Sequence, residues 1–168
     1  MRIAITNWSR RRAGGIESYL DALTRALHEH GHQVAFCYEM DAPATREQIA
    51  LPEGIRSWCV TDMGVEETLD GLRDWQPDLI FTHRLFNTEF EIGTLRIAPA
   101  VFFSHDYNGM CISGAKSFKS PTVKVCTRKF GWPCLLHYYP HRCGGLNPLT
   151  MLSDYKRQSK RQELMRQY

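Results

Sequence analysis

The stretch that decides the fold is GGIESYLDALTRALHEHGHQVAFCY, residues 14–38, together with the MRIAIT that precedes it at residues 1–6. Three consecutive apolar residues in MRIAIT predict a short buried strand. Apolar side chains then recur at helical spacing from Ile16 to Leu27, with charged side chains on the other faces. Gly31 is expected to end this helix, and residues 32–38 predict a second strand. A strand, a helix and a strand in this order form a right-handed parallel βαβ unit.

The alternation continues more loosely along the chain. Further strands are expected at residues 55–60, 79–82 and 100–104, and helices at residues 66–75 and 87–97. Strands that alternate with helices predict an α/β fold, here a Rossmann-like doubly wound parallel sheet.

Length and composition limit the class of protein. The chain has 168 residues, of which 43% are hydrophobic and 23% charged, so one domain with a real core is expected. No apolar run approaches the length of a membrane span. The N-terminus lacks the long apolar segment of a signal peptide, which favours a cytoplasmic location.

The small excess of positive charge is concentrated at the C-terminus. The net charge is +3, and residues 151–168 alone carry five basic and two acidic side chains. A basic helix is expected at residues 149–167. Its charge predicts either a solvated helix face or a surface that meets anionic lipid or a partner domain, which would place the protein peripherally at the inner membrane face.

A segment without clear periodicity, residues 107–148, separates the expected sheet from this helix and is interpreted as an insertion within a single domain 1–168. It contains four cysteines without a CxxC pair, namely Cys111, Cys126, Cys134 and Cys143. Three interpretations stay open: ligands of a structural zinc or an iron–sulfur cluster, two disulfides, or free thiols packed as small apolar groups. His137 and His141 could replace a thiolate ligand.

Candidate ligand-binding residues lie where the expected strands end. Gly14 and Gly15 open the first helix, where exposed N–H groups and the helix dipole favour phosphate. Arg84, after the strand 79–82, could pair with a phosphate or carboxylate. His105, followed by Asp106, ends the strand 100–104, where a neutral imidazole can hydrogen-bond a hydroxyl. These strand ends should meet in one crevice, because parallel sheets bind ligands beyond their carboxyl ends.

The same loops allow other interpretations. The glycine pair could serve only as a turn, and Arg10, Arg11 and Arg12 could form a solvated charged run or contact an acidic substrate. The dinucleotide fingerprint GxGxxG is absent, which argues against a nicotinamide-dependent enzyme. Glu39 and Glu47 share an E-x7-E spacing, which we interpret as coincidence because both follow the second strand.

The MRIAI strand, GGIESYLDALTRALHEHGHQVAF and the later FFSHD together resemble the N-terminal domain of a family 4 retaining glycosyltransferase. The resemblance covers nearly all of residues 1–106. It implies one half of a GT-B fold, in which two Rossmann-like domains face each other. The resemblance extends into the cysteine-containing segment, since some members of the family carry one after the HD dipeptide.

The resemblance also implies roles for individual residues. His105 would match the family histidine near the transferred sugar. Asp106 and Arg84 are expected as further substrate contacts from their positions at the strand ends rather than from the resemblance. Gly14 and Gly15 would lie near the donor diphosphate or the acceptor. A nucleotide sugar and an unknown acceptor would be the substrates, and the family's chemistry requires no metal. The nucleotide-binding C-terminal domain is not in this sequence, so we expect the chain alone to be inactive. The alternative function is a non-catalytic binding or metal-binding module built on the four cysteines.

Overall fold

The computed structural model describes residues 1–12, 14–41 and 45–168, and it forms two compact units. The first unit comprises Met1–His105 together with Tyr168, and the second comprises Asp106–Gln167. Within the described residues, no helix is both long enough and apolar enough to cross a membrane.

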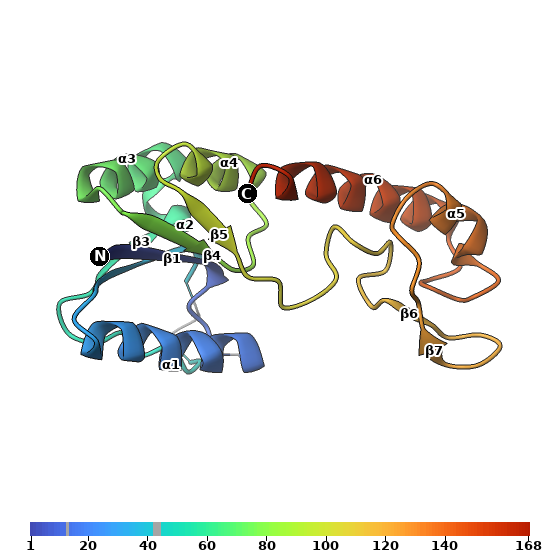
Figure 1. Cartoon of the computed structure of the whole chain (residues 1–168), viewed down its shortest axis with the longest axis horizontal. Coiled ribbons are helices and arrows are strands. Elements are labelled where there is room, and N and C mark those ends of the chain that lie inside the picture. Colours follow the sequence, from blue (N-terminus) through green and yellow to red (C-terminus); the bar gives the residue numbers. More distant parts are fainter. Residues whose placement is uncertain (13, 42–44) are drawn as a thin grey trace. The chain divides into compact units, whose positions relative to one another are not determined.

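A parallel sheet of five strands forms the centre of the first unit (Figure 1). The strand order is β3-β2-β1-β4-β5, and every neighbouring pair is parallel. The strands are β1 (Arg2–Ser9), β2 (Gln33–Met40), β3 (Arg56–Cys59), β4 (Leu79–Thr82) and β5 (Ala100–Phe102). This order, with crossovers on both sides of β1, confirms the predicted Rossmann-like α/β fold and is consistent with one half of a GT-B fold.

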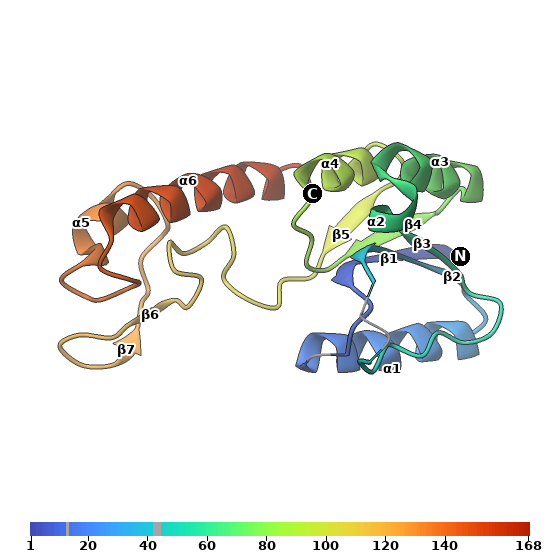
Figure 2. The ribbon, with the colours of Figure 1, turned by 180° about the vertical axis from the view of Figure 1, so that it is seen from behind.

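Helices cover both faces of this sheet. Helix α1 (Gly15–Glu29) lies on one face, and α3 (Val65–Trp75) and α4 (Thr88–Leu95) lie on the other, as the two opposite views show (Figures 1 and 2). A short helix, α2 (Val60–Met63), connects β3 to α3. Because both faces are covered, the central strands carry consecutive buried apolar residues, such as Ile3, Ala4 and Ile5 of β1, rather than an alternating pattern.

The core is divided between the two faces of the sheet. On the α1 side, Ile3 and Ile5 of β1 pack in one cluster with Leu20 of the helix. On the other side, Ala4 of β1 belongs to a cluster that contains Leu72 of α3 and further residues of α4 and β4. Successive residues of β1 therefore serve opposite cores, as the pleat of a strand requires.

Several element boundaries differ from the sequence prediction, among them the ends of β1 and β3. Strand β1 continues to Ser9, whereas the expected strand, MRIAIT, ends at Thr6. Asn7 is fully buried, and its side-chain amide donates a hydrogen bond of 2.8 Å to the Ser9 carbonyl, which allows a polar residue inside the strand. Val60 begins α2 instead of ending β3. Gly31 adopts a φ of 80° just after α1, which confirms it as the residue that ends this helix.

The second unit has little regular structure beyond its last helix. A two-stranded hairpin, β6 (Ser117–Phe118) with β7 (Lys124–Val125), is followed by α5 (Pro133–Tyr138) and α6 (Pro148–Met165). Asn147 caps α6 by accepting a hydrogen bond of 2.9 Å from the Leu149 N–H. The structure thus confirms the expected C-terminal helix and groups it with the cysteine-containing segment in one compact unit.

Candidate functional site

The carboxyl ends of β4 and β5 carry the same short pattern, Phe-x-His. It occurs as Phe81–His83 and as Phe103–His105. Backbone pairing continues past both strands, because His83 N–H donates to the Thr6 carbonyl at 2.9 Å and Phe103 N–H donates to the Thr82 carbonyl at 2.8 Å. Residues two apart in extended chain point to the same face, so the pattern brings two phenylalanines and two histidines together.

The two histidines are in direct contact. His83 Nδ1 lies 2.8 Å from His105 Nε2, and the two rings stack with centroids 5.1 Å apart. His83 is fully buried, whereas His105 is partly exposed. Burial, and after it the neighbouring His105, lowers the pKa of His83 to about 3. His83 therefore remains neutral at any pH near neutrality.

A neutral His83 constrains the proton between the two rings. Its Nε2 is buried and has no hydrogen-bond partner in the described part of the chain. A buried N–H without an acceptor is less tolerable than a buried lone pair, so the proton of His83 belongs on Nδ1, where it donates to His105 Nε2. In neutral His105 the proton then sits on Nδ1, and this ring acts as a hydrogen-bond donor from that atom.

Five rings at this edge form what we call the aromatic cluster: Tyr19, Phe81, His83, Phe103 and His105. Tyr19, from α1, stacks on Phe103 with centroids 5.3 Å apart and meets the His105 ring edge-on at 5.7 Å. Tyr19 and Phe103 are 37% and 42% exposed, so one side of the cluster is open to solvent. Aromatic faces beside an imidazole suit a sugar, which has both C–H faces and hydroxyl groups.

The predicted glycine pair lies at the start of the same helix. Gly14 is the N-cap of α1 and Gly15 its first residue, and both are exposed. Tyr19 is about one turn further along, so the structure brings the start of α1 and His105 to one edge of the sheet. Glu17, 4% exposed in the first turn, already complements the positive end of the helix. A phosphate bound there would share this end of the helix with a carboxylate.

Arg84 and the loop after it form the next part of this edge. The Arg84 guanidinium lies 4.9 Å from the centre of the Phe86 ring, which also meets Trp8 of β1 edge-on. Glu39, at the end of β2, accepts hydrogen bonds from the Phe86 and Asn87 N–H groups at 2.8 and 2.5 Å. Its carboxylate therefore fixes the loop that carries Arg84.

The arginines of the first loop have acidic partners. Arg10 lies 3.4 Å from the carboxylate of Asp41, and Arg12 forms an ion pair of 2.6 Å with Glu47. These exposed pairs fit the interpretation of a solvated charged run. Glu39 and Glu47 thus have separate structural partners despite their E-x7-E spacing.

The remaining predicted residues belong to the second unit. Asp106 accepts a hydrogen bond of 2.8 Å from the Asn108 N–H and so stabilises its own turn. The four cysteines of this unit are free thiols. Across the residues that the structure describes, no three His, Cys, Asp or Glu side chains already form a metal-binding arrangement.

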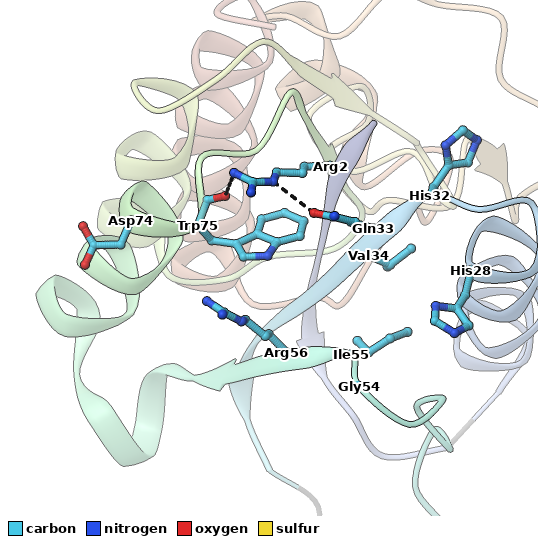
Figure 3. Close-up of a pocket in the computed structure, with 10 residues that line it drawn as sticks. All are labelled: Arg2, His28, His32, Gln33, Val34, Gly54, Ile55, Arg56, Asp74 and Trp75. Carbon is cyan, nitrogen blue, oxygen red and sulfur yellow. Dashed lines mark hydrogen bonds between the residues drawn. The ribbon is translucent and has the colours of Figure 1, made fainter.

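A separate hollow of about 550 Å³ lies at the opposite, amino edge of the sheet (Figure 3). Arg2 crosses it, with hydrogen bonds of 3.0 Å to the Gln33 side chain and to the Trp75 carbonyl. His28 and His32 border it from the end of α1 and the start of β2. Parallel sheets bind ligands at the carboxyl edge, so this hollow is not the expected site.

The sequence prediction named His105 but not the side chains that contact it. His83, Tyr19 and Phe103 were not among the predicted site residues, although they surround His105. The repeated Phe-x-His at two adjacent strand ends was the signal that could have found two of them.

Fold and site together define a Rossmann-like domain whose carboxyl edge carries a histidine pair. The comparison with protein families matches residues 13–142 to the model described as Glycosyltransferase Family 4. This match covers well over half of the 168 residues, so the chain belongs to glycosyltransferase family 4.

The other two comparisons add little. No curated protein matched the chain. Among solved structures, a match is glycinamide-RNase-transformylase T from Mycobacterium tuberculosis, with 16% identity and a TM-score of 0.37. The alignment covers 60% of this chain and 26% of that one, so the chain spans about a quarter of the matched protein.

Proposed function

We propose that this chain is the acceptor-side domain of a retaining glycosyltransferase of the GT-B type. It would act with a nucleotide-diphosphate sugar as donor and an acceptor hydroxyl whose identity is open. The observation that carries the proposal is the His83–His105 pair, 2.8 Å apart at the carboxyl edge of a family 4 domain. The donor nucleotide would be held chiefly by a second α/β domain.

His105 is the proposed catalytic residue, and His83 is its positioning residue. His105 would hydrogen-bond a hydroxyl of the bound sugar. The stacked rings of Tyr19 and Phe103 would support the sugar's apolar face. Alignment of the reacting groups is then the contribution of these side chains.

In the proposed reaction, the bond between the anomeric carbon and the diphosphate oxygen breaks, and the acceptor oxygen bonds to that carbon on the same face. The electron pair of the broken bond stays on the diphosphate, which takes up the proton that the acceptor hydroxyl loses. Negative charge develops on the leaving diphosphate, so hydrogen-bond donors aimed at it lower the barrier. Gly14 and Gly15 would contribute N–H groups, and Arg84 a positive charge.

The class of reaction is tested by nucleotide release from UDP-glucose, UDP-N-acetylglucosamine and GDP-mannose. We expect the complete two-domain enzyme to release a nucleoside diphosphate from at least one of them when an acceptor is present. The 168-residue chain alone should release little or none. Full turnover by the isolated chain would contradict the division of labour, and the absence of release by the complete enzyme from any nucleotide sugar would contradict the function.

A further inference from the structure

Two buried polar atoms at the carboxyl edge of the sheet lack hydrogen-bond partners. One is Asn7 Oδ1, near the end of β1, and the other is His83 Nε2, directly after β4. Neither atom has a partner in the described part of the chain, and both side chains are fully buried. Nearly all buried polar groups in folded proteins are hydrogen-bonded, so a pair of exceptions in one place requires an explanation.

These two residues are neighbours across β1 and β4. The parallel pairing of the two strands joins Thr6 to Thr82, and the His83 N–H continues the pairing by donating to the Thr6 carbonyl at 2.9 Å. The next pair in this register is Asn7 and His83. Adjacent strands lie about 4.8 Å apart, so the two side chains start side by side.

Both side chains point to the face of the sheet that α1 covers. Side chains alternate along a strand, so Asn7 shares its face with Ile5. By the same rule His83 shares its face with Phe81. Ile5 and Phe81 belong to the core cluster on the α1 side. Tyr19 of α1 supports this assignment, because its ring centre lies 5.8 Å from that of His83.

The contact with His105 directs the unpartnered nitrogen of His83 toward β1. His105 follows β5, which lies on the other side of β4 from β1. His83 Nδ1 is the atom that contacts His105, at 2.8 Å. The two nitrogens of an imidazole project to opposite sides of the ring, so Nε2 is directed away from β5. Asn7 is the residue of β1 at this level.

The two unpartnered atoms can only accept hydrogen bonds. The Asn7 amide group Nδ2 donates to the Ser9 carbonyl at 2.8 Å, which identifies Oδ1 as the free carbonyl oxygen. Nε2 of the neutral His83 ring carries a lone pair when the proton is on Nδ1. Two acceptors cannot bond to each other, but one water molecule can donate an O–H to each of them. Buried waters in proteins serve polar groups of this kind.

From this geometry we propose that Asn7 is a positioning residue of the histidine pair and acts through one buried water that bridges Asn7 Oδ1 and His83 Nε2. The bridge keeps the lone pair on Nε2 and the His83 proton on Nδ1, where it donates to His105 Nε2. Hydrogen bonds then run from Asn7 through the water and His83 to His105 and fix the orientation of the His105 ring. The effect on glycosyl transfer rests on the proposed function, whereas the bridge itself does not.

A crystal structure of the wild-type chain that orders buried waters tests the bridge directly. We expect one water at about 2.7–3.2 Å from both Asn7 Oδ1 and His83 Nε2. A direct contact between the two side chains, or a space between them without a water, would overturn the proposal. This measurement uses no variant, so it does not depend on whether a substituted chain folds.

Nitrogen NMR of the imidazole rings tests the role of Asn7 in solution. In the wild type, His83 Nε2 should give the signal of an unprotonated nitrogen that accepts a hydrogen bond. Asn7→Leu removes Oδ1 and should shift this signal. Thr6→Val is the matched control, because the Thr6 hydroxyl is also buried and unpartnered but points to the opposite face of the sheet. An Nε2 signal that is unchanged by Asn7→Leu, or that belongs to a protonated nitrogen, contradicts the bridge.

Kinetics of the complete enzyme connect the bridge to glycosyl transfer. We expect Asn7→Leu to lower kcat by about tenfold with little change in KM, the effect of losing one hydrogen bond that aligns His105. Thr6→Val should leave kcat nearly unchanged. An equal loss in both variants would mean that Asn7 only supports the fold. A bridging water in a protein that transfers no sugar would contradict the proposed function alone.

Discussion

His83 was not among the predicted site residues, but its hydrogen bond with His105 orients that ring. Because His83 is fully buried, its pKa is lowered to about 3 from the ordinary value of 6.5. Below pH 6.5 the unfolded chain therefore binds a proton at His83 that the folded chain does not bind. The stability that neutral His83 permits is present above this pH and is lost as the pH falls toward 3.

The pH dependence of unfolding tests this environment. We expect the free energy of unfolding to fall between pH 6 and pH 4 more steeply in the wild type than in His83→Gln, by about 1 kcal/mol per pH unit. Denaturant titrations at several pH values measure the slope of the unfolding free energy for each protein. The carboxylates and the other histidines contribute to both slopes and cancel in the difference. Equal slopes for the two proteins would contradict a buried, neutral His83.

Individual residues also show where sequence reasoning stops. The position of His105 at a strand end was predictable because it closely follows an apolar strand. Tyr19 was not, because in sequence it is one more apolar position of α1, and only the packing of α1 against the sheet places its ring on Phe103. The four cysteines were visible as a group, but only the fold shows that three of them, Cys126, Cys134 and Cys143, pack at one apolar cluster.

At the scale of elements, the close packing of α3 and α4 predicts that alanine at position 93 destabilises the fold. Helix propensity alone predicts the opposite effect. Gly93 lies inside α4, where helix propensity favours alanine by about 1 kcal/mol. A Cβ atom there would overlap the Leu69 side chain, which is 3% exposed and has little room to shift. We expect Gly93→Ala to lower the free energy of unfolding by about 1–3 kcal/mol.

Gly15→Ala is the matched control for this effect. A Cβ atom at Gly15 would meet no heavy atom within 4 Å, so stability should change by less than about 0.5 kcal/mol. Chemical denaturation of both variants makes the comparison. A stable Gly93→Ala protein would mean that α3 and α4 pack less closely than described here.

Elements as a whole were largely predictable, and their ends were not. The helix at 66–75 and the strand at 79–82 were expected from periodicity and agree with α3 and β4. The extra length of β1 was not, because Asn7 and Ser9 are polar, and their burial depends on hydrogen bonds that no sequence pattern reveals.

At the scale of the whole molecule, the charge is distributed unevenly. Residues 1–150 carry no net charge, but the two units differ in sign. The first unit has a net charge of −5, from ten basic and fifteen acidic side chains, and the second has a net charge of +8. On α6, Lys156, Arg157 and Lys160 are exposed, as are Leu149 and Leu152. Exposed cations beside exposed leucines favour an anionic lipid surface.

Vesicle binding tests this surface. We expect the chain to co-sediment with vesicles that contain phosphatidylglycerol at low salt, more weakly at high salt, and hardly at all with phosphatidylcholine alone. Reversing the three charges with Lys156→Glu, Arg157→Glu and Lys160→Glu should weaken binding at least tenfold. Equal binding to both kinds of vesicle, or no effect of the triple variant, would contradict an electrostatic membrane contact.

The most direct test of the central claim compares two histidines at opposite edges of the same sheet. In the complete enzyme, His105→Ala should lower kcat by about 100-fold, the loss that misalignment of the reacting groups causes. His32→Ala, at the amino-edge hollow, should leave kcat within about twofold while both variants keep the melting temperature of the wild type. A near-normal kcat for His105→Ala, or an equal loss in both variants, would contradict a transfer site at the carboxyl edge.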